Sequence, residues 1–500
     1  MIISFPSQLL HQLQNGADRV ACVVNDEQWT YSRLALNTGG IQKRIHRTGS
    51  VVVGVVTQNH PSTYATLLAI WLTGKAYVPV QASYPAERLQ SIVADSGLTH
   101  VFYAEENDEI AALKANLPDL RYECSAELES DELYNTHPDA GKNAYILFTS
   151  GTTGKPKGVP ITFGNLQAFL SGFYQLGYSL SDEDRFLQMF ELTFDLSVIS
   201  FLVPLTLGAS FYTIPSGMIR TLGLYHVLDH YQITFSLMVP SAVNLLAPYL
   251  EDEELPHLRY SQFCGEALRT DLLEKWMRCV PNALVDNVYG PTEATIYCTT
   301  QRMSGTQADK LSYNGVAGIG KPMAEVGVLI LAENGTEANA DEVGELCLSG
   351  AQLTPGYLNN AEQNQRAFFI RNDIRYYRTG DLVFCDKHGN IQYVGRADDQ
   401  IKIQGFRIEL AEIELAARRI LPQQTHVAVG IQDPQGNWHL VLFVHQLLAD
   451  PEVIRDELSR LLPEYMLPHS VLHTDDVPLN ANGKTDRKAL RKLAIELLFQ

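Results

Sequence analysis

Short apolar runs alternate with helix-like segments along most of the chain. The run at 50–57 predicts a buried strand, and the apolar segment 62–73, which ends at Gly74, predicts a helix. A second strand is predicted at 76–80 and a second helix at 86–96. The same pattern recurs near Phe148, at 163–174, around 235–239 and at 241–249. This alternation is typical of mainly parallel β-sheets that are covered by helices.

The pattern changes after about residue 320, where shorter β-runs are separated by turns. We therefore expect a β-rich subdomain at about 320–397. The charged segment that begins at Gly395 then precedes a final stretch with both strand and helix patterns. The predicted fold class is α/β, with a large N-terminal domain (1–397) of helix-covered, mainly parallel sheets and a small α+β domain (398–500).

Length, composition and charge narrow the class of protein. The chain has 500 residues, of which 45% are hydrophobic and 19% charged, as in a soluble protein of several domains. The formal net charge of −19 argues against general binding to nucleic acids or membrane surfaces. The apolar stretches at 51–56 and 65–72 are too short to cross a bilayer, and the N-terminus lacks the basic region of a signal peptide. The seven cysteines show no metal-ligand spacing, which favours reduced thiols. We expect a cytoplasmic protein without a nucleic-acid partner or membrane insertion.

Residues 149–159 read TSGTTGKPKGV and follow the apolar run 144–148. The loop holds hydroxyl side chains that can donate to a phosphate, glycines that let backbone N–H groups approach it, and lysines that supply positive charge. These residues are Ser150, Thr152, Thr153, Gly151, Gly154, Lys155 and Lys157. A plain polar turn is the alternative, but the concentration of donors and charge favours a phosphate-binding loop.

This loop lacks the spacing of a Walker A motif. A closer mimic of that motif begins at Gly315 and continues through Gly320 and Lys321, but Pro322 follows. Proline removes both the hydroxyl that would bind magnesium and a helix-starting N–H. We therefore interpret this second segment as a structural turn.

The loop at 149–159 is one of nine segments, seven of which contain glycine, that follow one another along the chain. In order, they are LAIWLTGKAYVPVQASYPAERL (68–89), TSGTTGKPKGV (149–159), TFDLS (193–197), NVYGPTEAT (287–295), GELCLSGAQLTPGYL (344–358), YRTGD (377–381), GRADDQIKIQGFRIELAEIE (395–414), LPEYMLP (462–468) and NGKTDR (482–487). Together, and in this order, they resemble the adenylate-forming superfamily. The resemblance covers essentially the full length, and within the superfamily it is similar to amino-acid adenylation enzymes of nonribosomal peptide synthesis and D-alanine–carrier-protein ligases.

The resemblance implies that ATP and Mg²⁺ are used to activate a carboxylic acid. A carboxylic acid with a pKa near ~4 is already ionised at pH 7, so its attack on the α-phosphate needs no general base. The difficulty is to bring two anions together, and catalysis should consist mostly of positioning and charge stabilisation.

The resemblance also assigns residues to parts of ATP. Tyr289 would lie against adenine, with Asn287 near its exocyclic amine, and Asp381 would accept from the ribose hydroxyls with Arg396 nearby. The phosphate loop would hold the β- and γ-phosphates with Thr149, Ser150, Gly151, Thr152, Thr153, Gly154 and Lys157.

Three residues are implied to act at the reacting phosphate. Thr292 would contact the α-phosphate and Glu293 would coordinate Mg²⁺, which prefers oxygen ligands. Lys484 would bridge the substrate carboxylate and the α-phosphate in the transition state. Considered in isolation, Lys484 would be interpreted as a solvated loop lysine, but its Asn-Gly-Lys-x-Asp-Arg context favours the catalytic role.

The family's second step passes the acyl group to a thiol after the C-terminal domain rotates. The hinge maps to Asp398, so residues 398–500 are expected to form a mobile lid. Gly405 and the 407–409 strand would then face the incoming pantetheine, although a simple β-bulge at Gly405 is an equal alternative.

Asp195 is the candidate specificity residue. In amino-acid-activating relatives an aspartate here pairs with the α-ammonium group of the substrate, because a buried cation needs a buried anion. The alternative is a helix N-cap before Leu196. By motif offset, the other pocket positions are Leu196, Ile199, Ser241, Gln262, Cys264, Gly265, Val288, Ile296 and Tyr297. This lining has no second charge, which favours a small or medium neutral amino acid.

The predicted function is ATP-dependent formation of an aminoacyl-AMP and transfer of the amino acid to the phosphopantetheine thiol of a carrier protein. Two versions stay open. The segments at 194–198 and 262–267 are similar to D-alanine–D-alanyl carrier protein ligases, whereas TEATIYCTT (292–300) is more similar to peptide synthetases. An acyl- or aryl-CoA ligase of the same superfamily is a further alternative, which Asp195 disfavours. A non-catalytic nucleotide-binding protein on the same fold is disfavoured by the presence of Lys484, Glu293 and Asp381 together.

Neither a carrier motif after Lys484 nor a condensation motif is visible, so we expect a separate carrier protein that is met in trans. Carrier proteins of this type are usually acidic, and the chain itself is acidic. A local basic patch is therefore a candidate contact, with a solvated helix face as the alternative. Its residues would be Arg487, Lys488, Arg491 and Lys492.

Overall fold

The structure is a computed structural model of the chain, and it describes residues 3–151, 154–246, 253–303, 311–445, 450–479 and 485–499. The chain forms two compact units. Unit 1 comprises Met1–Ala82, Val93–Leu147 and Gly158–Ala397, and unit 2 comprises Ser83–Ile92, Phe148–Lys157 and Asp398–Gln500. Unit 2 therefore includes two short segments from the first third of the sequence. The predicted domain limits of 1–397 and 398–500 stay a prediction.

The first large sheet of unit 1 has nine strands in the order β17-β14-β13-β12-β11-β9-β10-β1-β2. Its strands are β1 (Val20–Val24), β2 (Glu27–Thr30), β9 (Arg185–Gln188), β10 (Ser210–Thr213), β11 (Phe235–Met238), β12 (Tyr260–Phe263), β13 (Leu284–Tyr289), β14 (Thr299–Met303) and β17 (Lys321–Pro322). The six central strands, β13, β12, β11, β9, β10 and β1, pair in parallel. The strands β2, β14 and β17 pair antiparallel at the two edges.

The second large sheet has six strands in the order β6-β5-β3-β4-β7-β8. They are β3 (Val52–Val56), β4 (Ala76–Val80), β5 (His100–Tyr103), β6 (Arg121–Cys124), β7 (Asn143–Thr149) and β8 (Lys157–Thr162). The pairs among β3, β4, β5, β6 and β7 are parallel. These two sheets confirm the predicted α/β class with mainly parallel sheets.

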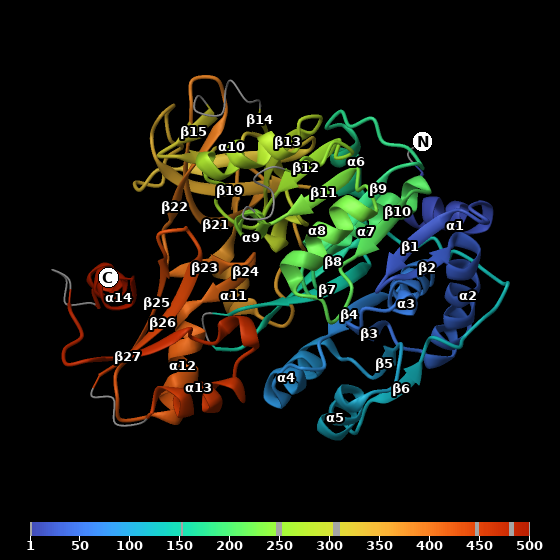
Figure 1. Cartoon of the computed structure of the whole chain (residues 1–500), viewed down its shortest axis with the longest axis horizontal. Coiled ribbons are helices and arrows are strands. Elements are labelled where there is room, and N and C mark those ends of the chain that lie inside the picture. The colour runs from blue at the N-terminus through green and yellow to red at the C-terminus, as the bar shows by residue number, and fades with distance from the viewer. Residues whose placement is uncertain are drawn as a thin grey trace. The chain divides into compact units, whose positions relative to one another are not determined.

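Helices cover both sheets (Figure 1). They are α1 (Phe5–Asn15), α2 (Tyr31–Thr48), α3 (Pro61–Leu72), α5 (Asp108–Asn116), α6 (Phe163–Tyr174), α7 (Leu196–Leu207), α8 (Arg220–His230), α9 (Pro240–Leu246) and α10 (Thr270–Cys279). Two further helices differ: α4 (Ala86–Ser96) is divided between the two units, and α11 (Ala361–Ala367) packs against a third, antiparallel sheet of unit 1. Every residue of α3 is buried, and so is every residue of α7 except Leu207. Their sequences are apolar on all sides, as expected for helices enclosed by other elements.

Trp71 in α3 shows how these elements meet in the core of unit 1. Its ring packs edge-on against Phe5 of α1 at 5.4 Å and stacks on Phe201 of α7 at 5.6 Å. Its indole N–H donates to the carbonyl of Ala144 in β7 at 3.0 Å. A buried tryptophan that satisfies its only donor in this way fixes two helices against one sheet.

A third sheet of unit 1 is antiparallel and has five strands. They are β18 (Val326–Leu331), β19 (Gly344–Gly350), β20 (Phe368–Arg371), β21 (Ile374–Cys385) and β22 (Ile391–Arg396). This is the expected β-rich part of the fold.

The Walker-like segment is divided between two turns and an edge strand. Gly315 has φ +74° in the hairpin that joins β15 (Ser312–Tyr313) to β16 (Val316–Ala317). Gly320 has φ +72°, and Lys321–Pro322 then pairs with β14 as β17. The prediction of a structural turn was therefore incomplete, because the proline lies on an edge strand where no inward N–H is needed.

Unit 2 contains a three-stranded sheet with helices on both faces. The elements of unit 2 after residue 398 are β23 (Gln400–Ile403), β24 (Phe406–Glu409), α12 (Leu410–Ile420), β25 (His426–Gln432), β26 (Trp438–His445), α13 (Pro451–Ser459), β27 (Ser470–Thr474) and α14 (Arg487–Phe499). The three-stranded sheet consists of β25, β26 and β27, and β23 pairs with β24. Ala428 of β25 packs in a cluster with α12 and α13, whereas Val427 and Val429 pack with α14. Alternate residues of one strand thus face opposite layers, which confirms the predicted α+β character.

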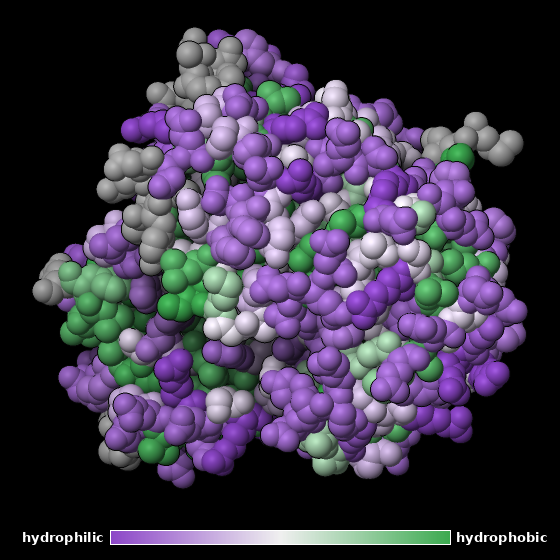
Figure 2. Space-filling view, turned by 45° about the vertical axis from the view of Figure 1, so that its right-hand side comes forward, coloured by the Kyte–Doolittle hydropathy of each residue, from purple (hydrophilic) through white to green (hydrophobic). Residues whose placement is uncertain are grey.

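The surface agrees with the composition. Figure 2 shows a face that is covered mostly by hydrophilic residues. No helix in the part of the chain that the structure describes is both long and apolar enough to cross a membrane. All seven cysteines are described, and none of them forms a disulfide.

Candidate functional site

Two adjacent strands place part of the predicted amino-acid pocket on one face of the nine-stranded sheet. Gln262 of β12 is in register with Asp286 of β13. Cys264 lies two residues after Gln262, and Val288 lies two residues after Asp286. Because side chains alternate along a strand, all four share one face of the sheet. Cys264, Gln262 and Val288 are at most 2% exposed, so this face is closed to solvent.

Asp195 and its neighbours enter the same region from α7. Asp195 is 4% exposed and stands at the N-cap position, but its side chain makes no capping hydrogen bond to the helix. Leu196 and Ile199 follow in the first turn and are 1% exposed. Burial raises the pKa of the Tyr77 and Tyr145 hydroxyls, and the nearby Asp195 carboxylate raises the pKa of both further. The Asp195 side chain therefore lacks the hydrogen bond that an N-cap residue normally makes to its helix. Its carboxylate is buried and lies near Tyr77 and Tyr145.

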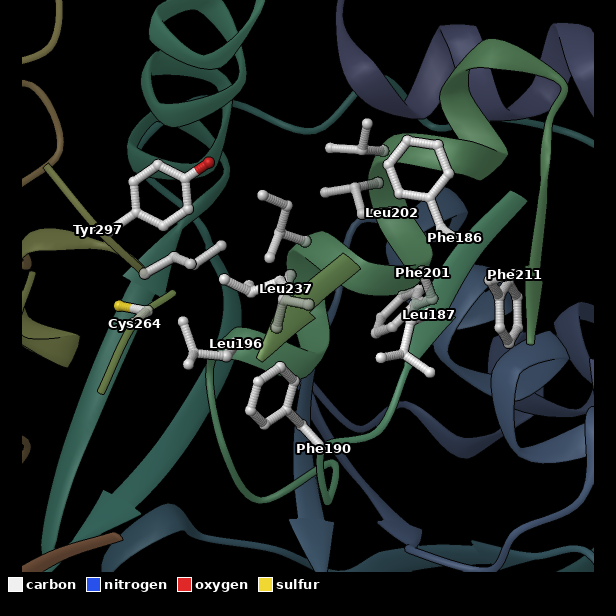
Figure 3. Close-up of a cluster of buried hydrophobic side chains, with 14 of the residues drawn as sticks. Phe186, Leu187, Phe190, Leu196, Phe201, Leu202, Phe211, Leu237, Cys264 and Tyr297 are labelled. Carbon is white, nitrogen blue, oxygen red and sulfur yellow. The ribbon is translucent and has the colours of Figure 1, made fainter. Parts of the chain in front are cut away.

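Figure 3 shows Leu196, Cys264 and Tyr297 at one end of the buried cluster, with Phe201 and Phe211 at the other. Three separate elements thus bring predicted pocket residues together. The Tyr297 ring also packs edge-on against Phe169 of α6 at 5.0 Å.

The pocket loop at Thr295–Ile296 is strained. Thr295 has φ +57° and Ile296 has φ +70°, in the left-handed region that β-branched residues rarely adopt. The buried Gln352 side chain donates to the carbonyls of Ala294, Thr295 and Tyr297 at 3.0–3.4 Å. Strained backbone of this kind is typical of functional sites, and here Gln352 holds it.

Ser241 and Gly265 complete the predicted pocket residues. The Ser241 hydroxyl donates to Glu266 at 3.2 Å, and its backbone N–H donates to the same carboxylate at 2.8 Å. Gly265 has φ +89°, which explains why glycine stands there. The hydroxyl of Ser241 is thus already bonded to protein.

The predicted nucleotide residues of unit 1 form a buried group at β13, β21 and β22. Asp381 accepts from the Tyr289 hydroxyl at 2.5 Å and from Arg396 Nη1 at 2.9 Å. Burial and the Asp381 charge raise the pKa of Tyr289, so its hydroxyl stays protonated. Asp381 and Arg396 are cross-strand partners, which explains their contact. The side-chain amide of Asn287 donates to the carbonyl of Gly318 at 2.9 Å.

The Thr292–Glu293 segment forms a short 3₁₀ turn, η2 (Thr292–Ala294). Glu293 is fully buried and accepts from the Tyr357 hydroxyl at 2.6 Å. The Thr354 N–H donates to the carbonyl of Glu293 at 2.8 Å. The loop before α11 therefore holds this carboxylate in one orientation.

Residues 149–151 and 154–157 of the phosphate loop belong to unit 2, where several donors already have partners. The Gly151 N–H donates to Glu412 at 3.1 Å, and the Ser150 hydroxyl donates to the Arg407 carbonyl at 2.7 Å. Lys157 lies 3.9 Å from a carboxylate oxygen of Glu409. Carboxylates of α12 and β24 thus lie close to groups that we predicted to bind phosphate.

Two glycines give this loop its shape. A Cβ on Gly151 would lie 2.0 Å from the Lys155 carbonyl oxygen, and Gly154 has φ +77°. Side chains would prevent both features. The hydroxyl of Thr149 is buried, and within the described ranges it has no hydrogen-bond partner.

Some predicted residues of unit 2 have roles that the sequence did not indicate. Gly405 (φ +83°) follows Gln404 (φ +50°) in a two-residue hairpin turn between β23 and β24, not in a bulge. The Asp398 carboxylate accepts from the Gln400 N–H at 3.2 Å. Arg487 is half-buried and pairs with Glu414 at 2.6 Å and Asp399 at 2.9 Å, so its charge is already engaged within unit 2; the docking patch stays a prediction.

Lys484, Thr152 and Thr153 lie outside the described residues, so the structure does not place them. Within the described ranges, no three His, Cys, Asp or Glu side chains are close enough to hold a metal ion. A cavity of about 440 Å³ lies at the ends of β3, β4, β9 and β10 and is lined by polar side chains such as Gln58, Gln81 and Gln188. None of its described lining residues is a predicted substrate-binding residue.

Sequence reasoning missed Gln352 and Tyr357, which hold the pocket loop and Glu293. Both lie in the segment GELCLSGAQLTPGYL that carried the resemblance. Their contacts join residues about 60 positions apart, so the fold is needed to show them.

A family model described as AMP-binding enzyme matches residues 9–358. The chain belongs to the AMP-binding enzyme family. This confirms the resemblance to adenylate-forming enzymes.

The chain is similar to peptide synthetases, to a D-alanine–carrier-protein ligase and to a solved adenylation domain. The chain is 32% identical over 494 residues to tyrocidine synthase 3 of Brevibacillus parabrevis, covering 96% of this chain but 8% of that synthase. It thus spans a small part of the peptide synthetases that it matches. It is 30% identical over 496 residues to the D-alanine–D-alanyl carrier protein ligase of Bacillus licheniformis, covering 96% of this chain and 97% of the ligase. The Vibrio cholerae adenylation domain AlmE, solved with glycyl-adenosine-5′-phosphate, superimposes with a TM-score of 0.87 at 28% identity, covering 99% and 98% of the two chains.

Proposed function

We propose that this AMP-binding enzyme activates a small or medium neutral amino acid. The substrate carboxylate attacks the α-phosphorus of ATP, an aminoacyl-AMP forms, and pyrophosphate leaves. The thiolate of a phosphopantetheine arm on a carrier protein then attacks the acyl carbon, and AMP leaves. The observation that carries the proposal is Asp195, a buried carboxylate beside an otherwise neutral pocket.

The pocket supports a small or medium substrate. A cationic α-ammonium group placed against Asp195 would balance a buried negative charge, which an acyl or aryl acid could not do. Leu196, Ile199 and Tyr297 close the space around it with buried side chains. The similarity to a D-alanine–carrier-protein ligase and to AlmE with its glycyl adenylate favours amino acids of this size. D-alanine loading is therefore the second candidate.

The nucleotide residues support ATP as the other substrate. Asp381, held by Tyr289 and Arg396, would accept from the ribose hydroxyls. Tyr289 and Asn287 would contact adenine, Thr292 would contact the α-phosphate, and the loop that includes Lys157 would hold the β- and γ-phosphates. Lys484 would bridge the two reacting groups, and Asp398 would serve as the hinge between the two steps.

A magnesium ion fits the donor set if ATP supplies most of its ligands. Glu293 is a fully buried carboxylate in the segment assigned to Mg²⁺, and Tyr357 fixes its orientation. Mg²⁺ commonly binds one or two protein carboxylates together with substrate phosphates and water. When bound, it would neutralise phosphate charge, while Glu293 and Tyr357 would set its position.

An ATP–pyrophosphate exchange screen tests the proposal. The panel contains the proteinogenic amino acids, D-alanine, β-alanine and simple acyl and aryl acids that lack an amino group, and a neutral small or medium amino acid should give the strongest exchange. A preference for D-alanine would select the second candidate. Exchange only with a carboxylic acid that lacks an amino group, together with a CoA thioester product, would indicate an acyl- or aryl-CoA ligase. No exchange with any amino acid would contradict the proposal.

Tyr357→Phe should lower kcat/KM for Mg·ATP about tenfold. It removes a hydrogen bond to a buried carboxylate, and such charge-assisted bonds contribute about 1.5–3 kcal/mol. Exchange rates over a series of Mg²⁺ and ATP concentrations measure the change. Tyr376→Phe is the matched control, because the Tyr376 ring stacks on Phe369, whereas the Tyr357 hydroxyl donates to Glu293. Equal kcat/KM values for both variants would contradict a role for Tyr357 at the site.

A further inference from the structure

A continuous chain of hydrogen bonds joins the protein surface to the proposed amino-acid pocket. Arg302, whose side chain is 43% exposed, donates from Nε and Nη2 to Asp286 at 3.0 Å each. The Tyr178 hydroxyl donates to the same carboxylate at 2.5 Å. Gln262 Nε2 donates to the Tyr178 oxygen at 2.7 Å, and the Tyr297 hydroxyl donates to Gln262 Oε1 at 3.1 Å. The last two residues belong to the predicted pocket.

Strand register brings the first part of this chain together. Gln262, Asp286 and Arg302 are cross-strand partners on β12, β13 and β14, so they lie side by side on one face of the sheet. Tyr178, in the loop after α6, covers them, and its ring packs edge-on against Tyr260 at 4.9 Å. The Arg302 guanidinium also lies 5.4 Å from the centre of the Tyr178 ring.

The chemistry of the groups fixes the direction of every bond. Arginine can only donate and a carboxylate can only accept, so Tyr178 must give its single proton to Asp286. Burial and the Asp286 charge raise the pKa of Tyr178, which keeps that proton in place. The Tyr178 oxygen must then accept, and the NH₂ group of Gln262 supplies the proton. The carbonyl of Gln262 is thereby turned towards Tyr297, whose hydroxyl must donate to it.

In this arrangement the polar groups at the pocket wall are hydrogen-bonded within the protein. Gln262 and Tyr297 are 0% exposed and are bonded to each other, and the hydroxyl of Ser241 is bonded to Glu266. The hydroxyl protons of Tyr297 and Ser241 are thus engaged within the protein. A substrate hydroxyl could still donate to their oxygens, but its own oxygen would lose the donors that water supplied. Such a loss costs about 1–3 kcal/mol in proteins.

We propose that Tyr178, held by the Asp286–Arg302 ion pair, is a positioning residue that makes the pocket select against hydroxyl-bearing amino acids. This inference rests on the proposed function. Tyr178 acts through Gln262, whose amide it orients, and the ion pair acts through Tyr178. The substrate class that follows is an amino acid with an apolar side chain or none.

The test is the ratio of kcat/KM for an apolar amino acid to that for its hydroxylated counterpart, in ATP–pyrophosphate exchange. Alanine and serine, valine and threonine, and phenylalanine and tyrosine are the pairs, and the pair nearest in size to the best substrate is used. Tyr178→Phe frees the Gln262 amide to turn and pair with a substrate hydroxyl. The ratio should fall about tenfold from a wild-type value above one, while the KM for ATP stays unchanged.

Tyr260→Phe is the matched control. The Tyr260 hydroxyl contacts Ser179 N at 3.0 Å and Arg259, so its loss removes a neighbouring hydroxyl without reaching Gln262. This variant should keep the wild-type ratio. A wild type that responds to amino acids but whose ratio does not change in Tyr178→Phe would overturn the positioning role alone. A wild type that shows no exchange with any amino acid would overturn the proposed function and this inference with it.

Discussion

Replacing Asp195 with asparagine should lower kcat/KM for the amino acid in ATP–pyrophosphate exchange by a factor on the order of 10²–10³. Asparagine keeps the shape of the side chain but removes the charge that would pair with the α-ammonium group. Breaking one partner of a buried ion pair typically costs about 3–5 kcal/mol, and each 1.4 kcal/mol corresponds to a factor of about ten. The KM for ATP should stay close to the wild-type value, because the nucleotide residues are a separate group.

Asp184→Asn is the matched control for Asp195→Asn. Asp184 is also a buried carboxylate of unit 1, but its partners are Arg259 at 2.9 Å and Thr234 at 2.6 Å. Both variants lose one buried negative charge, so a general loss of folding would affect them alike. Full exchange activity in Asp195→Asn, per mole of folded protein, would refute the specificity role of this residue.

Replacing Arg88 with methionine should destabilise unit 2 by about 3–5 kcal/mol. Arg88 is 6% exposed and donates to Glu412 at 2.8 Å, and Glu412 is 3% exposed. Removing one partner leaves the other charge buried without its counter-ion. Urea unfolding followed by hydrogen exchange of 83–92 and 398–445 measures the loss where it arises.

The exposed pair Arg419–Glu87 provides the control, because it joins the same two segments at 2.7 Å with side chains 57% and 61% exposed. Arg419→Met should cost less than about 1 kcal/mol. The double variant Arg88→Met/Glu412→Met should recover much of the stability that Arg88→Met loses, since apolar side chains of similar volume can replace a buried pair. Equal losses in Arg88→Met and Arg419→Met would show that burial does not govern this pair.

Glu412 also connects the stability of unit 2 to its phosphate loop. Its second carboxylate oxygen accepts from the Gly151 N–H, a donor that the sequence assigned to phosphate. A loop rich in hydrogen-bond donors is predictable from its residue types, because hydroxyl side chains, glycines and lysines that occur together favour the binding of an anion. Which acceptor those donors meet depends on residues more than 250 positions away, and no local pattern reports that contact.

Several secondary-structure elements, the fold class and the family were predictable from the order of the amino acids. The helix expected at 86–96 is Ala86–Ser96 and the strand expected at 76–80 is Ala76–Val80, because apolar periodicity and chain-breaking residues act locally. The order of the nine motifs carried the resemblance, and with it the candidate roles of Asp195, Asp381 and Lys484.

How the site residues are held could be learned only from the folded chain. Gln352 on the strained turn, Tyr357 on Glu293, and Tyr178 on Gln262 are contacts between segments distant in sequence. The fold also pairs Arg487, a candidate docking residue, with Glu414 within unit 2. One cause accounts for all of these cases. The direction of a hydrogen bond and the pairing of a charge depend on which groups lie within about 3 Å, and it is the fold that brings those groups together.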